Sequence, residues 1–305
     1  MMLRQTAGCA AIAVLLAMQG LAAGEPKIER NVIFGMYSGL ALLMDVHYPA
    51  KPNGYGVVYI AGSGFHASQA YNASPLKQSG QVLLFAKPLT EAGYTVFAIC
   101  HRAAPRFRYP AAVEDVQRAV RFIRHNAKTY GIRPDRIGAT GGSSGGHLVS
   151  MLGVLDGKGD PDDPDPVNRE SAKVQCVVAR AAPTDLVARM QEGSTGTATI
   201  ASFLGMRLPG NAPPNSIEAR TYREASPVTH VSSDDPPMLL LHGDEDRTVP
   251  IEQSEIMEQA LKKAGVEVKL LRVAGGGHGA NFSGVENPPD YLGETVRWFD
   301  RHLRK

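Results

Sequence analysis

The stretch Arg136-Ile-Gly-Ala-Thr-Gly-Gly-Ser-Ser-Gly-Gly-His147 decides the fold. It opens as a short apolar run typical of a buried strand, and residues 147–155 continue as an apolar helix-like run. Between them, Ser143 has Gly141 and Gly145 two residues away on either side, which is the G-x-S-x-G pattern of a nucleophile elbow. In such a sharp, strained turn a side chain at either glycine would collide with the neighbouring strand or helix. The pattern therefore predicts an exposed serine at the end of a strand.

A glycine-rich turn or a phosphate-binding loop is the alternative interpretation of this stretch. The Gly-x-x-x-x-Gly-Lys pattern of a Walker loop is absent from the chain. The stretch also offers a second register, because Ser144 lies between glycines in Gly142-Ser-Ser-Gly-Gly146. We place the nucleophile at Ser143 and expect Ser144 to begin the following helix.

Short apolar runs alternate with longer helical stretches along the rest of the chain. The runs predicted as strands are 40–48, 56–60, 95–100, 136–140, 174–179, 238–241 and 266–271. Several are apolar on both faces, as parallel strands covered by helices must be. Helical periodicity is clear at 111–124, 251–264 and 291–302. The chain is therefore predicted to be α/β, with a mostly parallel doubly wound sheet and helices on both faces.

Length and charge restrict the class of protein. The chain has 305 residues, and its 32 Lys and Arg against 30 Asp and Glu leave a net charge of +2. This balance provides no basic surface for nucleic acid, so no nucleic-acid partner is expected. One α/β domain over residues 24–305 is large enough to bury a full core without metal or disulfide support.

The first residues have the pattern of a secretory signal. A basic start at Arg4 precedes the apolar run 10–18, and small residues follow at 22–24. We predict a signal peptide over 1–23, a secreted or periplasmic protein, and no stable membrane anchor, because the apolar run is short. A lipoprotein signal is the alternative, but Cys9 precedes the apolar run instead of following it.

Three other features of the sequence are the two remaining cysteines, an acidic segment and a long insertion. Cys100 and Cys176, which remain after the signal, lie in or at the end of apolar strand runs and are expected to be buried free thiols. The acidic segment 160–166 lacks the EF-hand pattern and is predicted to be a solvated loop, not a calcium site. Residues 185–227 separate two strands by far more than a usual connection. This insertion is a candidate lid or substrate wall, or else a surface excursion with its own small core.

A serine nucleophile needs a base and an orienting acid, which this type of fold supplies in the chain order Ser, Asp or Glu, His. Asp246 lies in the loop after the strand run 238–241, and His278 lies in a glycine-rich loop after the run 266–271. Both loops are expected at the same sheet edge as Ser143, where ligands of open α/β sheets bind. We predict that Ser143, Asp246 and His278 form a catalytic triad.

Other residues compete for these roles. Asp244 is the alternative acid, but its position directly after Gly243 suits turn capping. The alternative bases are His66, His101, His147 and His242. We expect His242 to brace the acid loop and His101 to brace the loop after the Cys100 strand.

An oxyanion site needs backbone N–H groups aimed at the developing charge. One is expected from Ser144, the residue after the nucleophile, and the others from the turn 61–66 that follows the strand run 56–60. A simple strand-end turn is the alternative for that segment. Phe65 and His66, in the same turn, are predicted to contact substrate.

At this point the chain resembles the hormone-sensitive-lipase-like and feruloyl-esterase-like (BD-FAE) branch of the α/β-hydrolases. The segments that carry the resemblance occur in register from about residue 40 to 300; they are His101-Arg-Ala-Ala-Pro105, Tyr109-Pro-Ala-Ala112, the elbow with His147-Leu148, and His242-Gly-Asp-Glu-Asp246 with Val249-Pro250. Two departures are visible. The family's H-G-G-G loop reads Ala61-Gly-Ser-Gly64, and Ser144 replaces the usual alanine.

The resemblance implies oxyanion donors at Ser63 and Gly64 together with Ser144, and hydrolysis of carboxylic esters through an acyl-enzyme. It implies a small or medium acyl ester as substrate, free or linked to a polysaccharide, and no cofactor or metal. Two alternatives remain open: a prolyl-oligopeptidase-like serine peptidase, and a noncatalytic binding member of the fold. The sequence leaves the oligomeric state open.

Overall fold

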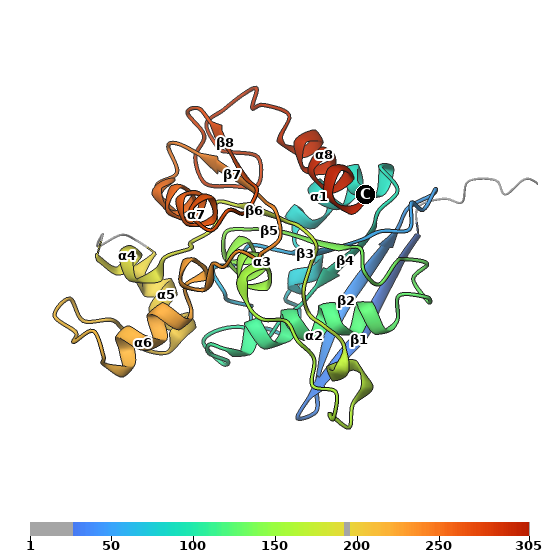
Figure 1. Cartoon of the computed structure of the whole chain (residues 1–305), viewed down its shortest axis with the longest axis horizontal. Helices are drawn as coiled ribbons and strands as arrows, with labels where there is room; N and C mark the ends of the chain where they lie inside the picture. Colours follow the sequence, from blue (N-terminus) through green and yellow to red (C-terminus); the bar gives the residue numbers. More distant parts are fainter. Residues whose placement is uncertain (1–26, 192–195, 305) are drawn as a thin grey trace, which may run out of the picture.

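The computed structural model describes residues 27–191 and 196–304, so the predicted signal peptide lies outside the described residues. In this part of the chain, eight strands form one sheet in the order β1-β2-β4-β3-β5-β6-β7-β8 (Figure 1). The strands are β1 Lys27–Tyr37, β2 Leu40–Tyr48, β3 Gly56–Ile60, β4 Thr95–Ile99, β5 Ile137–Gly142, β6 Val177–Arg180, β7 Met238–Gly243 and β8 Val268–Val273. β3 to β8 pair in parallel, whereas β1 and β2 join as an antiparallel edge. The predicted mostly parallel sheet is confirmed.

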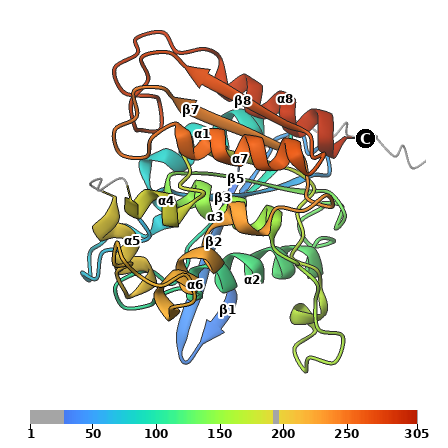
Figure 2. The ribbon, with the colours of Figure 1, turned by 60° about the vertical axis from the view of Figure 1, so that its left-hand side comes forward.

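Helices cover both faces of this sheet. The helices are α1 Gly80–Glu91, α2 Ala111–His125, α3 Ser144–Val154, α4 Leu186–Gln191, α5 Thr197–Leu204, α6 Ile217–Glu224, α7 Glu252–Lys263 and α8 Tyr291–Leu303, with short 3-10 turns at Leu76–Gln78, Pro166–Arg169 and Pro227–His230. α1 and α8 pack together on one face, and α2, α3 and α7 cover the other (Figures 1 and 2). The predicted doubly wound arrangement, with helices on both faces, is confirmed.

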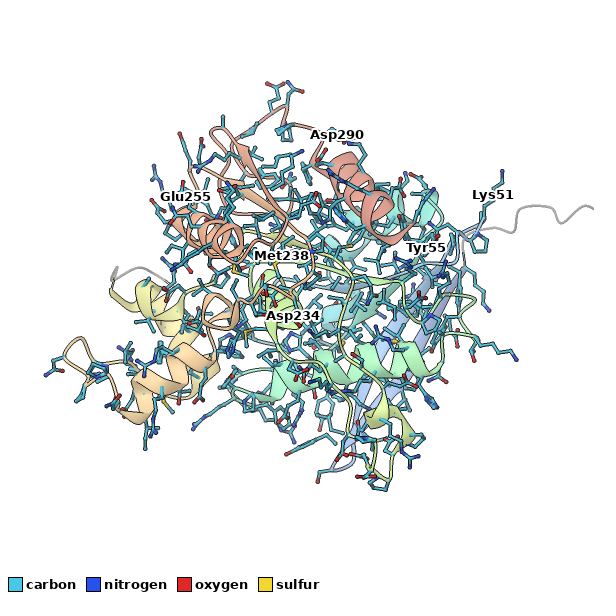
Figure 3. All side chains as sticks on the ribbon, viewed as in Figure 1. Lys51, Tyr55, Asp234, Met238, Glu255 and Asp290 are labelled. Carbon is cyan, nitrogen blue, oxygen red and sulfur yellow. The ribbon has the colours of Figure 1, made fainter. Side chains whose placement is uncertain are left out.

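Each face has its own apolar core because most of the central strands are buried on both sides. Val116, Val120 and Ile123 of α2 meet Leu148 of α3 in one core, and Phe85 of α1 belongs to the other. Side chains fill the space between sheet and helices, and Met238, at the start of β7, lies fully buried among them (Figure 3). Burial of apolar surface on both faces is what stabilises a domain of this size.

The strand order determines at which edge of the sheet a binding crevice forms. After β3 the chain crosses to β4 on one side and then returns to β5 on the other side of β3. Where strand order reverses in this way, the loops after the two strands diverge and leave a crevice at the carboxyl ends of the strands. Here those loops are the turn 61–66 after β3 and the elbow at Ser143 after β5.

The insertion 185–227 contains α4, α5 and α6, which lie together beside the carboxyl edge of the sheet (Figure 2). Ile200, Phe203 and Leu204 of α5 are buried in the core that α2 and α3 share, so the insertion has no separate core of its own. Tyr109 ties it to the body, since its N–H donates to the Phe203 carbonyl at 2.8 Å and its hydroxyl to the Glu224 carbonyl at 3.0 Å.

Two further features of the described residues bear on the sequence predictions. Cys100 and Cys176 are both free thiols; Cys176 is fully buried and Cys100 is half-buried. No helix between residues 27 and 304, outside the gap at 192–195, combines the length and the apolar character needed to cross a bilayer.

Candidate active site

Ser143 lies at the apex of the turn between β5 and α3, with φ 54° and ψ −124°. A positive φ is rare for a residue with a side chain and marks a strained backbone. The turn is closely packed: a Cβ at Gly145 would lie 2.1 Å from the Ile60 carbonyl oxygen. The strain is held by hydrogen bonds on both sides, from Ser143 N–H to the Arg180 carbonyl (2.8 Å) and from His147 N–H to the Ser143 carbonyl (2.9 Å). This is the elbow that the glycine spacing predicts.

Asp246 lies in the loop after β7, and its own loop fixes it. Its Oδ1 accepts hydrogen bonds from the N–H groups of Thr248 and Val249, both at 2.9 Å. The neighbouring His242 is fully buried and bonds to Ser254 Oγ (2.7 Å) and the Val249 carbonyl (2.8 Å). His242 therefore braces the acid loop, as expected from the sequence.

His278 lies in the loop after β8, which approaches the acid loop closely. A Cβ at Gly243 would lie 2.1 Å from the Gly276 carbonyl oxygen, so the two loops touch through their backbones. Ser283 Oγ donates to the His278 carbonyl at 2.8 Å. Asp244 accepts from the Gly275 N–H at 2.7 Å. Asp244 thus caps the histidine loop, and its carboxylate is exposed instead of facing the imidazole.

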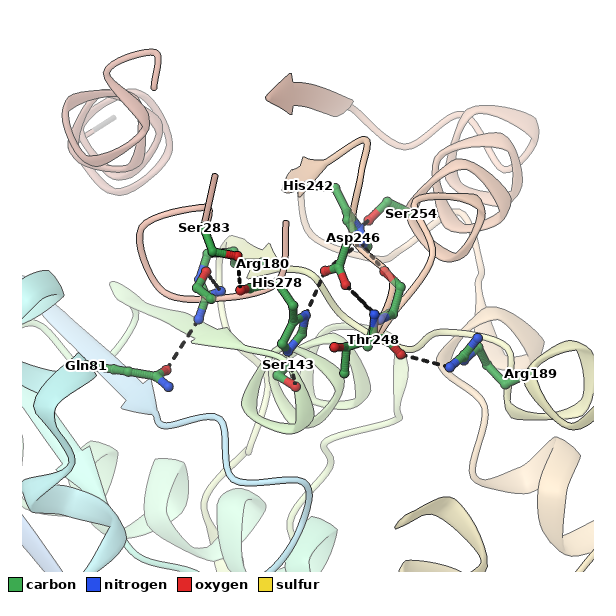
Figure 4. A network of polar contacts seen from close by, with 12 residues as sticks. Gln81, Ser143, Arg180, Arg189, His242, Asp246, Thr248, Ser254, His278 and Ser283 are labelled. Carbon is green, nitrogen blue, oxygen red and sulfur yellow. Dashed lines mark hydrogen bonds and ion pairs between the residues drawn. The ribbon is translucent and has the colours of Figure 1, made fainter. Parts of the chain in front are cut away.

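These three loops bring Ser143, His278 and Asp246 into one hydrogen-bonded chain (Figure 4). His278 Nε2 lies 3.1 Å from Ser143 Oγ, and His278 Nδ1 lies 2.6 Å from Asp246 Oδ2. The geometry suits a neutral imidazole that holds its proton on Nδ1 toward the carboxylate and accepts the serine proton on Nε2.

Asp246 is poised to stay ionised. Burial by itself raises the pKa of a carboxyl group, but hydrogen bonds from His242, His278 and the Val249 N–H outweigh burial and hold the pKa of Asp246 well below its usual range. A permanent negative charge behind His278 would stabilise an imidazolium formed by transfer of the serine proton.

The remaining histidines proposed as rivals lie elsewhere. His147 is fully buried on α3 against Phe65 and Phe203, and burial lowers its pKa to about 4. His101 Nδ1 contacts the Arg102 carbonyl at 2.9 Å beyond β4, and burial lowers its pKa as well. Neither histidine forms a hydrogen bond to a serine.

The predicted oxyanion residues gather beside Ser143, with one departure from the expected arrangement. Gly62 packs so tightly on the elbow that a Cβ there would lie 2.6 Å from the Gly142 carbonyl oxygen. Ser63, Gly64 and Ser144 all line the catalytic cavity. However, the Ser63 N–H donates to Ser144 Oγ at 2.9 Å. The Ser144 hydroxyl, which the family pattern lacks, therefore accepts the Ser63 N–H, a backbone donor that the oxyanion would use.

The two residues predicted to contact substrate behave differently. Phe65 lines the cavity and stacks on Phe203 of α5, with ring centroids 4.0 Å apart. His66 does not line it; its ring nitrogens contact the Gly64 carbonyl (2.6 Å) and Ser202 Oγ (3.0 Å). His66 thus joins the turn 61–66 to the insertion.

The catalytic cavity has a volume of about 330 Å³ and reaches from the elbow to the insertion. The sequence analysis missed several of its residues, which are Gln81, Arg180, Pro183, Arg189, Gly196, Thr199, Ile200, Thr248 and Val249. Arg180 carried the clearest signal, since it is a charged residue at the end of a buried apolar strand. A larger groove of about 610 Å³, lined by Tyr37, Arg118 and Asp163 among others, contains none of the triad.

Comparison with known proteins agrees with this geometry. The model of the BD-FAE family matches residues 44–261. A probable carboxylic ester hydrolase, LipM of Mycobacterium tuberculosis, is 34% identical over 183 residues, which are 57% of this chain and 39% of LipM. The chain therefore spans less than half the length of that relative.

Two solved structures resemble the chain over most of their length. A truncated carbohydrate esterase from gut microbiota is 28% identical with a TM-score of 0.74, covering 92% of this chain and 97% of that one. An acetyl ester-xyloside bifunctional hydrolase from Caldicellulosiruptor lactoaceticus is 28% identical with a TM-score of 0.69, covering 86% and 87%.

Proposed function

The chain belongs to the BD-FAE family of α/β-hydrolases, and we propose that it is a serine carboxylesterase that hydrolyses small or medium acyl esters through an acyl-enzyme. The observation that carries the proposal is the unbroken chain of hydrogen bonds from Ser143 through His278 to Asp246 at the wall of a cavity. A merely structural serine would not need a strained backbone that lifts its hydroxyl into a cavity.

In the first half of the reaction, Ser143 Oγ attacks the ester carbonyl carbon while His278 Nε2 takes the serine proton. The carbonyl oxygen becomes an oxyanion that accepts hydrogen bonds from the N–H groups of Ser144 and Gly64. The Ser63 N–H can donate to the oxyanion as well once its hydrogen bond to Ser144 Oγ breaks. His278 then donates its proton to the alcohol oxygen, and the alcohol leaves as the acyl-enzyme forms. In the second half, His278 activates water, which releases the acid and regenerates Ser143.

The cavity supports the proposed substrate size. A volume of about 330 Å³ lies at the small end of the range for ligand sites, which suits an acyl group of a few carbons. Ile200 of the insertion and Pro183, in the loop after β6, supply apolar wall. Since both solved relatives described above act on carbohydrate or xyloside substrates by name, the proposal extends to acyl groups linked to polysaccharide. The insertion 185–227 is proposed to form a substrate wall, since its residues line the cavity.

Burst kinetics test the activity. Mixing the enzyme with p-nitrophenyl acetate is expected to release a rapid stoichiometric burst of p-nitrophenol, because an acyl-enzyme accumulates when deacylation is slower than acylation. Peptide p-nitroanilides are the comparison substrates, and Ser143→Ala is the matched variant. Cleavage of the anilides with no ester burst would favour a peptidase. Absence of turnover on both classes, together with no labelling by an organophosphate, would favour a noncatalytic binding protein.

A further inference from the structure

The catalytic cavity contains a buried positive charge whose polar partners among the described residues are all neutral. Arg180 ends β6 and is 2% exposed. Its guanidinium donates to the Gly279 carbonyl at 2.5 Å and to Gln81 Oε1 at 3.3 Å, and it lies 5.8 Å from the centroid of the Phe85 ring. Its Nε is buried without a hydrogen-bond partner among the described residues. Within the same part of the chain, no carboxylate forms an ion pair with it.

A buried cation without a counter-ion is costly. Burial lowers the pKa of Arg180, with Asp246 among the groups that oppose the shift from a distance. An arginine still keeps its charge in proteins, so the desolvation cost is not removed by losing a proton. Such a charge is normally balanced by a carboxylate or a phosphate. The described residues that line the cavity include Arg180 and Arg189 but no Asp or Glu.

The position of Arg180 identifies the part of the substrate that it would meet. Arg180 holds the carbonyl of Gly279, the residue directly after His278, and it contacts Gln81 in the first turn of α1 (Figure 4). His278 must lie next to the leaving alcohol, because it donates a proton to that oxygen. Elsewhere in the same cavity, Ile200 of the insertion and Pro183, in the loop after β6, supply apolar wall.

We propose that the alcohol part of the natural ester carries a carboxylate, as a uronic acid does, and that this group pairs with Arg180. The inference rests on the esterase activity proposed above. The long bond from Arg180 to Gln81 Oε1 is the one that the substrate carboxylate would replace, because a charge-assisted hydrogen bond is stronger than a long bond to a neutral amide. No acidic residue occupies the first turn of α1, so no fixed negative charge there would repel the substrate.

The test compares two acetate esters of nearly the same shape, 4-acetoxybenzoate, which carries a negative charge, and 4-acetoxybenzamide, which is neutral. The measured quantity is the ratio of their kcat/KM values. We expect the wild type to favour the benzoate by about tenfold or more, since a close charged pair in a water-poor site strengthens binding by this order. Arg180→Met should reduce the ratio by about the same factor, and Gln81→Glu should do so too, because the new carboxylate would neutralise Arg180.

The ratio separates this role from a structural one. Arg180→Met also loosens the loop that carries His278, and that loss lowers kcat/KM for both esters alike. Lys87→Met is the matched control; Lys87 lies on the same helix as Gln81, but its side chain is 77% exposed and outside the cavity, so the ratio should not change. Mono-p-nitrophenyl glutarate, with its carboxylate on the acyl part, should gain nothing over p-nitrophenyl pentanoate.

Two results would overturn the inference without touching the esterase activity. The first is a wild-type benzoate to benzamide ratio near one while p-nitrophenyl acetate still gives a burst. The second is a ratio above ten that survives in both Arg180→Met and Gln81→Glu. Failure of every ester, burst included, would instead contradict the proposed function on which the inference rests.

Discussion

Replacing Ser144 with alanine tests how this chain uses the hydroxyl that its family pattern lacks. Ser144 Oγ accepts the Ser63 N–H at 2.9 Å and is almost fully buried. In the transition state the Ser63 N–H must leave this hydroxyl to reach the oxyanion. Breaking a neutral hydrogen bond of this kind costs about 0.5–1.5 kcal/mol. Because the alanine variant has no such bond to break, its kcat/KM should rise by about two- to tenfold.

The same substitution should make the folded state less stable. The variant leaves the Ser63 N–H without its partner, so the free energy of unfolding should fall by about 1 kcal/mol. Ser150→Ala is the matched control, because Ser150 is another buried serine of α3 and its hydroxyl bonds to the Gly146 carbonyl at 2.8 Å, outside the cavity. It should lose similar stability without gaining activity.

The assay is steady-state kcat/KM with p-nitrophenyl acetate, alongside urea unfolding of the three proteins. A drop of about tenfold or more in Ser144→Ala would refute the reasoning, because the hydroxyl would then be stabilising the oxyanion itself. Organophosphate labelling followed by mass spectrometry settles the register. Label that persists in Ser143→Ala and vanishes in Ser144→Ala would show that Ser144 is the nucleophile.

Three other predictions follow from the site and the sequence. His278→Ala and Asp246→Asn should each lower kcat by ~10³-fold or more with little loss of fold by circular dichroism. Asp244→Asn should keep most activity. A large loss of kcat in Asp244→Asn with activity retained in Asp246→Asn would show that Asp244 is the catalytic acid. Burial lowers the pKa of His147 to about 4, so as pH falls below about 6.5 the unfolded state takes up a proton before the folded state does. Between pH 6.5 and 4 the wild type should therefore lose about 3 kcal/mol of unfolding free energy relative to His147→Gln. Equal pH dependence in both proteins would contradict this. We propose that residues 1–23 are removed as a signal peptide, so that the mature protein starts near residue 24. Mass spectrometry of secreted protein that retains residues 1–23 would contradict this proposal.

The elements that the sequence predicted well are those in which one force dominates. α2 shows this clearly, because Val113, Val116, Val120 and Ile123 recur at helical spacing and all are buried. β1 was missed for the opposite reason: it is an edge strand whose residues are mostly exposed, so the apolar residues of Lys27–Tyr37 do not mark a buried face. α1 was missed because Gly80 and Pro88 lie within it, and both weaken local helix propensity. Packing of Phe85 and Leu89 against the sheet stabilises α1 instead.

The predicted and observed ends of β6 and β8 differ, because pairing with neighbouring strands determines where each strand begins and ends. β6 was expected from residue 174 but begins at Val177, because Gln175 is used to bond Ile137 through both its side chain and its N–H. β8 begins and ends two residues later than expected, so that Val273 pairs with Gly243 at the edge where the triad loops start. Local sequence carries little information about such register choices.

Ser143, Asp246 and His278 could be located from sequence because each follows a strand of a parallel sheet, and the carboxyl ends of parallel strands share one edge. Arg180 ends β6 at the same edge, between the strands that lead to Ser143 and to Asp246. The same topological rule would have placed it near the site, although the sequence analysis did not apply it to this residue. The rule could not predict the environment of Arg180. Its guanidinium donates to Gly279 and Gln81, each about 100 residues away in the chain, and forms no ion pair with a carboxylate among the described residues. A fold rule predicts which residues can meet, but the charge left unpaired when they do is a property of the packed side chains, and that is where substrate selection has to be sought.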